Sequence, residues 1–97
     1  MEHVKRVEII IDAPEVSSLL EILRGLNITS HTVFSNLTGA GHRGERRNDE
    51  PGGGSGNACV VVALSPEQLH TVVAAVRPLL KRRGGLCLVT DAQSVRH

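Results

Sequence analysis

Glycines and arginines occur at close spacing in one segment of this chain, Gly39-x-Gly41-x-Arg43-x-x-Arg46. Glycine lets backbone N–H groups approach an anion closely and adopts positive φ angles without steric cost. Arginine offers a planar fork of donors that suits the oxygens of a phosphate or a carboxylate. The segment therefore predicts a cradle for an oxyanion. The alternative is a flexible loop whose charges only keep it hydrated.

The segment differs from the common phosphate-binding motifs. It lacks the Gly-Lys-Ser/Thr ending of a Walker loop, and no helix opens on its glycines as a dinucleotide fingerprint requires. It belongs to a polar stretch, residues 37–57, that holds seven of the ten glycines in the chain. A structureless stretch of about 20 residues in a compact domain is generally functional or disordered. We therefore expect the function to reside in this loop, whose second half resembles a flexible linker.

The residues on both sides of the loop predict strands. Alternating or β-branched apolar runs predict four of them, at Val4–Asp12, Ile28–Asn36, Ala58–Leu64 and Leu86–Thr90. The polar residues 91–97 are expected to form a loose tail.

Two helices are expected between these strands. The first begins after Asp12-Ala-Pro-Glu and the second after Ser65-Pro-Glu-Gln, because both sequences combine a capping residue with an early proline. Gly25 and Asn27 should end the first helix, and Gly84-Gly85 the second. Pro78 is expected to kink the second helix or to end its regular part. Apolar residues at helical spacing define the buried stripes, Val16, Leu19, Leu20, Leu23 and Leu26 in the first helix and Leu69, Val72, Val73, Val76 and Leu80 in the second.

The order strand, helix, strand, strand, helix, strand predicts a single α+β domain over residues 1–97, a ferredoxin-like βαββαβ sandwich. Both helices would cover one face of a four-stranded antiparallel sheet. Strand side chains alternate between faces, so aliphatic residues must also occupy the uncovered face, which predicts self-association. In this topology the third and fourth strands flank the first. Cys59 and Cys87 are then not on neighbouring strands, and free thiols are expected.

Composition argues against several classes of function. The formal net charge is +1 and Phe34 is the only aromatic residue, so neither a basic field nor a stacking surface favours nucleic acid. No apolar run reaches the roughly 18 residues of a membrane-spanning helix, and the first residues lack an apolar signal region. A cytoplasmic protein is therefore expected. The acidic loop residues lack a partnered nucleophile, which argues against an enzyme. The five histidines form no i, i+4 pair, so no metal site is predicted.

The order of elements, the long loop between the second and third strands, and the pattern Thr32-Val33 followed by Gly39-x-Gly41-x-Arg43-x-x-Arg46 together resemble the PII-like signalling proteins. The pattern is most similar to the branch linked to inorganic-carbon uptake. That branch comprises regulators of the sodium-dependent bicarbonate transporter and carboxysome-associated PII proteins. The resemblance covers the whole chain in element order and length, but only the loop base is motif-like.

This resemblance implies a homotrimer that binds an adenine nucleotide, such as ADP or AMP, in clefts between subunits. The long loop, the T-loop of the family, spans about residues 37–57 here, changes shape with the ligand and docks on a target. The residues that match the family's nucleotide site are Thr32, Val33, Gly39, Gly41, Arg43, Gly44, Arg46, Gly84, Gly85 and Leu86. Bicarbonate binds near the T-loop in carboxysome-associated relatives, which here points to Gly41, His42, Arg43 and Arg46.

The implied function is a regulator that senses adenine nucleotides and bicarbonate and controls inorganic-carbon uptake or fixation. Its target would be a bicarbonate transporter or a carboxysome-related protein, which would bring a cytoplasmic regulator to the membrane or to the carboxysome. Some family features are absent: His31 stands where a tyrosine is common, and residues 92–97 lack the Cys-Gly-x-x-Gly-Cys ending of some transporter regulators. The alternative is a trimeric metal-binding or scaffold protein of the same fold without a nucleotide site. Basic residues at the end of the second helix are expected to favour its dipole, with a phosphate at Gly84-Gly85 as a second possibility.

Overall fold

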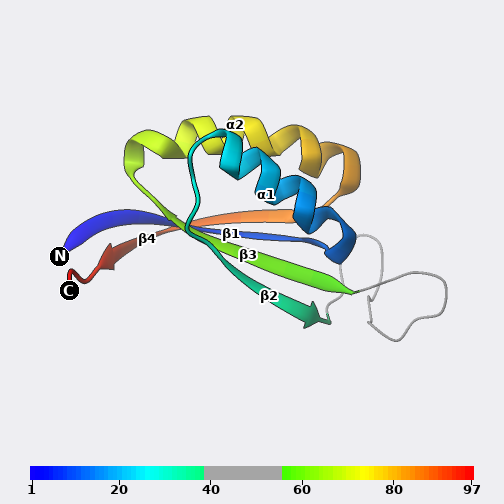
Figure 1. Cartoon of the computed structure of the whole chain (residues 1–97), viewed down its shortest axis with the longest axis horizontal. Coiled ribbons are helices and arrows are strands. Elements are labelled where there is room, and N and C mark those ends of the chain that lie inside the picture. Colours follow the sequence, from blue (N-terminus) through cyan, green and yellow to red (C-terminus); the bar gives the residue numbers. More distant parts are fainter. Residues whose placement is uncertain (39–55) are drawn as a thin grey trace.

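A computed structural model describes residues 1–38 and 56–97, in which four strands and two α-helices follow one another in the predicted order. The strands are β1 (Glu2–Asp12), β2 (Thr32–Leu37), β3 (Asn57–Leu64) and β4 (Leu86–Ser94). The helices are α1 (Val16–Gly25), preceded by the 3-10 turn η1 (Ala13–Glu15), and α2 (Pro66–Arg83). The strands form one antiparallel sheet in the order β2-β3-β1-β4, and both helices lie on the same face of it (Figure 1). The predicted ferredoxin-like fold is confirmed, with β3 and β4 flanking β1.

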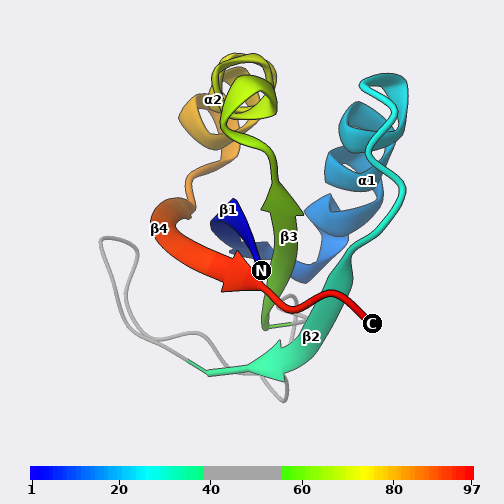
Figure 2. The same ribbon diagram turned by 90° about the vertical axis from the view of Figure 1, so that its left-hand side faces the viewer.

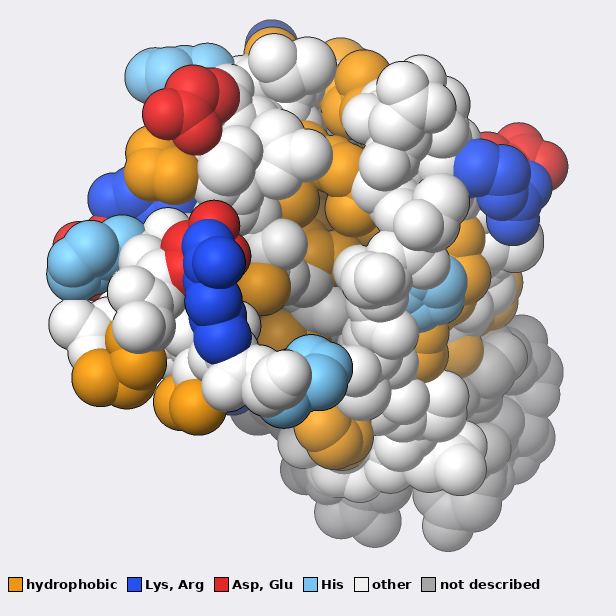
Figure 3. Space-filling view, turned by 60° about the vertical axis from the view of Figure 1, so that its left-hand side comes forward, with side chains coloured by type: hydrophobic (Ala, Val, Ile, Leu, Met, Phe, Trp, Pro, Cys, Tyr) orange, Lys and Arg blue, Asp and Glu red, His pale blue; other side chains and the backbone are white. Residues whose placement is uncertain are grey.

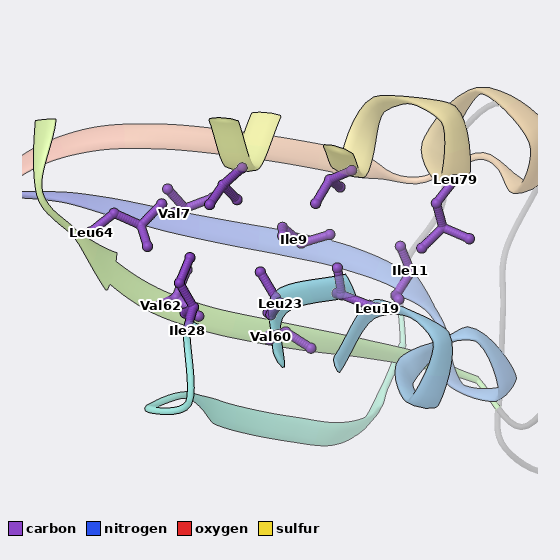
Figure 4. Packing of buried hydrophobic residues seen from close by; sticks show 12 residues of the cluster. Val7, Ile9, Ile11, Leu19, Leu23, Ile28, Val60, Val62, Leu64 and Leu79 are labelled. Atoms are coloured by element: carbon purple, nitrogen blue, oxygen red, sulfur yellow. The ribbon is translucent and has the colours of Figure 1, made fainter. Parts of the chain in front are cut away.

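The core lies between the helices and one face of the sheet (Figure 4). Every second residue of β1 points into it, namely Val7, Ile9 and Ile11, which are at most 2% exposed. Full burial of each such side chain contributes about 1.5–3 kcal/mol to stability. The remaining buried members come from β3, from both helices and from the connection after α1, namely Val60, Val62, Leu64, Leu19, Leu23, Val72, Val76, Leu79 and Ile28. Four of them belong to the predicted stripes, and five more stripe residues pack against the core while partly buried: Val16, Leu20, Leu26, Leu69 and Leu80. Val73 is the stripe residue in neither group. Leu79 is buried more deeply than the predicted Leu80, which only packs against the core.

The other face of the sheet is covered by no helix in the described part of the chain (Figure 2). Strand register places two rows of side chains across it. One row is Phe34–Cys59–Ile10–Leu86 and the other is Thr32–Val61–Glu8–Leu88. Phe34 is 53% exposed, Leu86 49% and Leu88 45%. The aliphatic second face predicted from the sequence is therefore present. We call these two rows, together with the next row Ala63–Arg6–Thr90, the open face.

The last strand is longer than the sequence indicated. β4 continues from Thr90 to Ser94 and pairs with the start of β1, down to Glu2 opposite Ser94. The expected loose tail is therefore wrong for Asp91–Ser94, because main-chain pairing holds these polar residues in the sheet. Lys5 Nζ lies 2.5 Å from a carboxylate oxygen of Asp91, and this bond lowers the pKa of Asp91 below its usual value.

The second strand is shorter than expected. It begins at Thr32, and Ile28 belongs instead to the connection that follows α1. Ile28 donates its backbone N–H to the Leu23 carbonyl at 2.9 Å and is buried in the core. Asn27 supplies the positive φ of 65° that this turn requires. Ile28, whose β-branched side chain favoured a strand in the sequence, therefore follows the end of α1 and buries that side chain in the core.

The predicted boundaries of the two helices fare differently. Ser65 caps α2 as predicted, since its hydroxyl accepts from the Gln68 N–H while the Gln68 side chain accepts from the Ser65 N–H. The first helix instead begins as a 3-10 turn, and the Asp12 side chain does not cap it. Pro78 does not end α2, which continues to Arg83. Because proline has no N–H, the Ala74 carbonyl lacks its usual helical hydrogen-bond donor. Ala74 and Pro78 are both exposed, so water can donate to that carbonyl instead.

Both cysteines are free, as expected. Cys59 is on β3 and Cys87 on β4, with β1 between them. Cys59 lies on the open face beside Ile10, whereas Cys87 pairs with Ile9 and packs against the core. Burial raises the pKa of both thiols. Within residues 1–38 and 56–97, no helix has the length and apolar character needed to cross a membrane.

Gly85 is a glycine whose replacement should harm this fold. A Cβ atom at Gly85 would lie 2.8 Å from the Ile10 carbonyl oxygen and 2.9 Å from the Ile11 side chain. The φ angle of Gly85 is +128°, which a residue with a side chain rarely adopts. We expect Gly85→Ala to lower the free energy of unfolding by about 2 kcal/mol or more, measured by urea denaturation. Gly25→Ala is the matched control, because the added Cβ in this helical position meets no atom within 4 Å beyond its chain neighbours and the backbone of its own helix. Its effect should be neutral or stabilising by up to about 1 kcal/mol. Equal stability of the two variants would contradict the close approach of Gly85 to β1.

Candidate functional site

The base of the long loop is held by the pairing of Leu37 with Asn57 at one end of the sheet. Six of the predicted site residues belong to the loop itself and lie outside the described residues: Gly39, Gly41, His42, Arg43, Gly44 and Arg46. Their roles remain predictions. The described residues at this end of the sheet show what surrounds the base of the loop.

Gly56, where the loop joins β3, has a defined place in the fold. It is buried, its φ is 76°, and its carbonyl accepts the Ala13 N–H at 3.0 Å. The sequence assigned this residue to a linker-like segment. The bond to Ala13 instead ties the end of the loop to the turn between β1 and α1. The signal for this anchor was weak, because Gly56 is one of several glycines in a row with serine.

The predicted residues Gly84 and Gly85 form the turn between α2 and β4, at the same end of the sheet as the loop base (Figure 1). The Gly84 N–H donates to the Leu80 carbonyl at 2.7 Å and so caps the helix. That N–H is therefore already engaged. Gly85 lies against the Ile10 carbonyl of β1. Both glycines have a structural reason to be present that is separate from the predicted role in phosphate binding.

The basic residues at the end of α2 differ in their partners. The Nε atom of Arg83 lies 3.1 Å from a carboxylate oxygen of Glu15, whose side chain is 17% exposed. This ion pair joins the end of α2 to η1, and spacing in the sequence gave no sign of it. Lys81 and Arg82 are exposed on the same last turn. Of the three, Arg83 is held by the fold, while Lys81 and Arg82 are better placed to favour the helix dipole or a bound phosphate.

Thr32 and Val33 begin β2, and the sheet points them in opposite directions. Val33 pairs with Val60 and packs against the core, whereas Thr32 pairs with Val61 on the open face. The Thr32 side chain is therefore the one available to a ligand on the open face. Leu86 is also on that face, paired with Ile10.

The predicted nucleotide-site residues lie at both edges of the sheet. Thr32 is on β2 and Leu86 on β4, and two strands separate them. Three strand spacings amount to roughly 14 Å. The β2 edge of one copy can meet the β4 edge of another copy. The arrangement therefore fits a site between subunits.

A metal centre has no support in the described part of the chain. There, no group of three or more His, Cys, Asp or Glu side chains is placed to hold a metal ion. The hollow between the two helices is lined by hydrophobic side chains (Figure 3). The site chemistry available here is thus that of glycine turns and basic side chains at the loop end of the sheet.

Comparison with known proteins agrees with this geometry. Residues 4–97 match the family model described as nitrogen regulatory protein P-II. No curated protein sequence matches the chain. Among solved structures, the chain is similar to CPII, a nitrogen regulatory PII-like protein from Thiomonas intermedia K12, in its form bound to ADP, AMP and bicarbonate. The TM-score is 0.88 at 20% identity, over 97% of this chain and 90% of that one.

Two further structures show the same fold. The apo form of CPII gives a TM-score of 0.80 at 19% identity, over 98% of this chain and 95% of that one. A PII-like signalling protein from Thermus thermophilus gives 0.74 at 14% identity, over 94% and 88% of the two chains. At these identities the similarity establishes the fold.

The ion pair between Arg83 and Glu15 should make a small contribution to stability. We expect Arg83→Ala to lower the free energy of unfolding by about 0.5–1 kcal/mol at low salt, because the Arg83 side chain is 57% exposed and water screens the pair. The difference should shrink in 1 M NaCl. Arg82→Ala is the control, since it removes the same charge from the adjacent residue. A loss of stability that is equal for both variants would show that the Arg83 pair is not specific.

Proposed function

Because this chain belongs to the P-II family of nitrogen regulatory proteins, we propose that it is a regulatory protein that binds ADP, AMP or a related adenine nucleotide. Binding takes place between subunits of a homotrimer. The T-loop, at about residues 37–57, becomes ordered when the nucleotide binds, and its conformation selects a protein target. The chain is a regulator rather than an enzyme in this proposal.

The observation that carries the proposal is the placement of the motif-bearing loop. Its base, between Leu37 and Asn57, lies at the same end of the sheet as the Gly84-Gly85 turn. In the proposed complex Arg43 and Arg46 hold the nucleotide phosphates, and Gly39, Gly41 and Gly44 let the loop backbone approach them. The Thr32 side chain and the Val33 backbone of one copy line the base pocket, and Gly84, Gly85 and Leu86 of a neighbouring copy complete the phosphate side.

Bicarbonate is the proposed second ligand. CPII has been solved with ADP and bicarbonate, and also with ADP, AMP and bicarbonate. The corresponding donors in this chain would be Arg43 and Arg46, with the Gly41 backbone and His42 beside them. We propose that the two ligands are coupled and that the loop controls inorganic-carbon uptake or fixation. The target is a bicarbonate transporter or a carboxysome-related protein, and the regulator reaches the membrane or the carboxysome from the cytoplasm through it.

Trimer formation is supported by two independent features. Large apolar side chains are exposed on the open face, which favours burial against another protein surface. The predicted site residues are divided between the two sheet edges, as they would be in a site shared by two copies. We expect a solution mass about three times the 10.4 kDa of one chain, measured by sedimentation equilibrium or light scattering. A monomer at tens of micromolar protein would contradict the inter-subunit site.

The proposed ligands can be tested directly by calorimetric titration with ADP, AMP and ATP, each with and without bicarbonate. We expect saturable nucleotide binding whose affinity changes when bicarbonate is present. Coupling between sites is reciprocal, so bicarbonate binding must change by the same factor when ADP is present. If no nucleotide binds, the alternative of a trimeric scaffold or metal-binding protein gains support.

The loop arginines should decide nucleotide affinity. We expect the double variant Arg43→Ala, Arg46→Ala to weaken ADP binding by at least about 100-fold, because each loses a charge-assisted hydrogen bond worth about 1.5–3 kcal/mol. The control, Arg24→Ala with Arg47→Ala, removes the same net charge from α1 and from the loop outside the motif. It should keep its affinity within about threefold, the range of general electrostatic effects. Equal weakening in both would indicate attraction by overall charge without the proposed contacts.

A further inference from the structure

One ion pair lies on the open face among its apolar side chains. Arg6 Nη2 is 3.0 Å from Glu8 Oε1. Both residues are on β1, two positions apart, so they point to the face opposite the helices, as the burial of Val7 and Ile9 in the core confirms. The register places Glu8 between Val61 of β3 and Leu88 of β4. A carboxylate therefore stands in the middle of a surface that is otherwise largely apolar.

Neighbouring side chains already shield Glu8 from part of the solvent. Its side chain is 29% exposed, and neighbouring Cys59 on the same face is 7% exposed. The pKa of the Cys59 thiol is raised by burial, with Glu8 adding to this effect and Arg6 opposing it. Covering the open face would remove more water from Glu8. An ionised carboxylate in such a place needs a cation and further hydrogen bonds to offset its desolvation.

The charges on this face match those of another copy of the same face. Each copy contributes one guanidinium and one carboxylate side by side, so the pair is self-complementary. Arg6 is the more exposed partner, at 55%, and its register neighbours, Ala63 and Thr90, are small. The Arg6 guanidinium has five N–H donors, and a single contact with Glu8 engages only part of them. Room and unused donors therefore remain for a carboxylate from a second copy.

We propose that Arg6 and Glu8 form a charged clasp between copies of this chain, in which Arg6 of one copy binds Glu8 of the next across the open face. The apolar rows supply the area for association. The clasp sets the register and rejects arrangements that leave either charge buried without a partner. This inference rests on the self-association proposed above and names the residues that make it specific.

Charge reversal tests the clasp. Arg6→Glu and Glu8→Arg each give a face with two like charges, and each should weaken assembly by at least about 100-fold, measured by sedimentation velocity over a range of concentrations. The double variant Arg6→Glu, Glu8→Arg restores one charge of each sign and should assemble within about tenfold of wild type. An equimolar mixture of the two single variants should assemble more tightly than either alone. This last result requires contact between copies, and damage to the fold of each chain cannot produce it.

Matched controls are available on the outer surface of α1. Glu21→Arg and Arg24→Glu make the same charge changes on exposed residues away from the open face, and they should leave assembly unchanged. Circular dichroism would confirm that each variant is folded. If wild type assembles and both single reversals assemble as tightly as wild type, the clasp is overturned while the trimer stands. The clasp is also overturned if the double reversal fails to assemble although it is folded. A monomeric wild type would instead overturn the proposed trimer and the clasp together, and nucleotide titration would judge the ligand proposal separately.

Discussion

The alternation of strand side chains in a sheet with helices on one side only is the constraint on which this structure depends. Val7, Ile9 and Ile11 reach the core, so Glu8 and Ile10 must face the other way. The same rule sends Val60 inward and Cys59 outward on β3. Apolar residues such as Ile10, Val61 and Leu88 therefore cannot reach the core under the two helices. The open face is therefore a consequence of the fold, and it makes association with another surface energetically favourable.

Several elements of this fold end together at the base of the long loop. The loop base, the turn after β1 and the Gly84-Gly85 turn share one end of the sheet. Short contacts hold them there: Ala13 donates to Gly56, Gly85 lies against Ile10, and Arg83 pairs with Glu15. These contacts fix the elements around the base of the loop, as the proposed ligand-dependent loop requires. The two sheet edges, by contrast, are separated within one chain, so the proposed nucleotide site and the proposed trimer depend on each other.

Local chemistry explains which predictions succeeded. The Ser65 capping box, the alternating run of β1 and most of the helical stripes depend on neighbouring residues and have the predicted form. The expected Asp12 cap is a local prediction that was wrong. Predictions that depended on distant residues were less accurate. Asp91–Ser94 is a strand because its backbone pairs with β1. Ile28 lies outside the expected strand because its side chain is buried in the core. Pro78 remains within a helix because its position faces water.

The sequence by itself determined the order of elements, the ferredoxin-like fold, the position of the long loop and the residues of its glycine and arginine motif. These follow from periodicity, capping and turn chemistry, which act over a few residues. Only the tertiary structure decided which residues meet across the sheet. It placed Thr32 and Leu86 at opposite edges, engaged the Gly84 N–H in a helix cap, and set Arg6 and Glu8 together on the open face. Strand register and the close approach of turns involve residues far apart in the chain, and no local pattern specifies them.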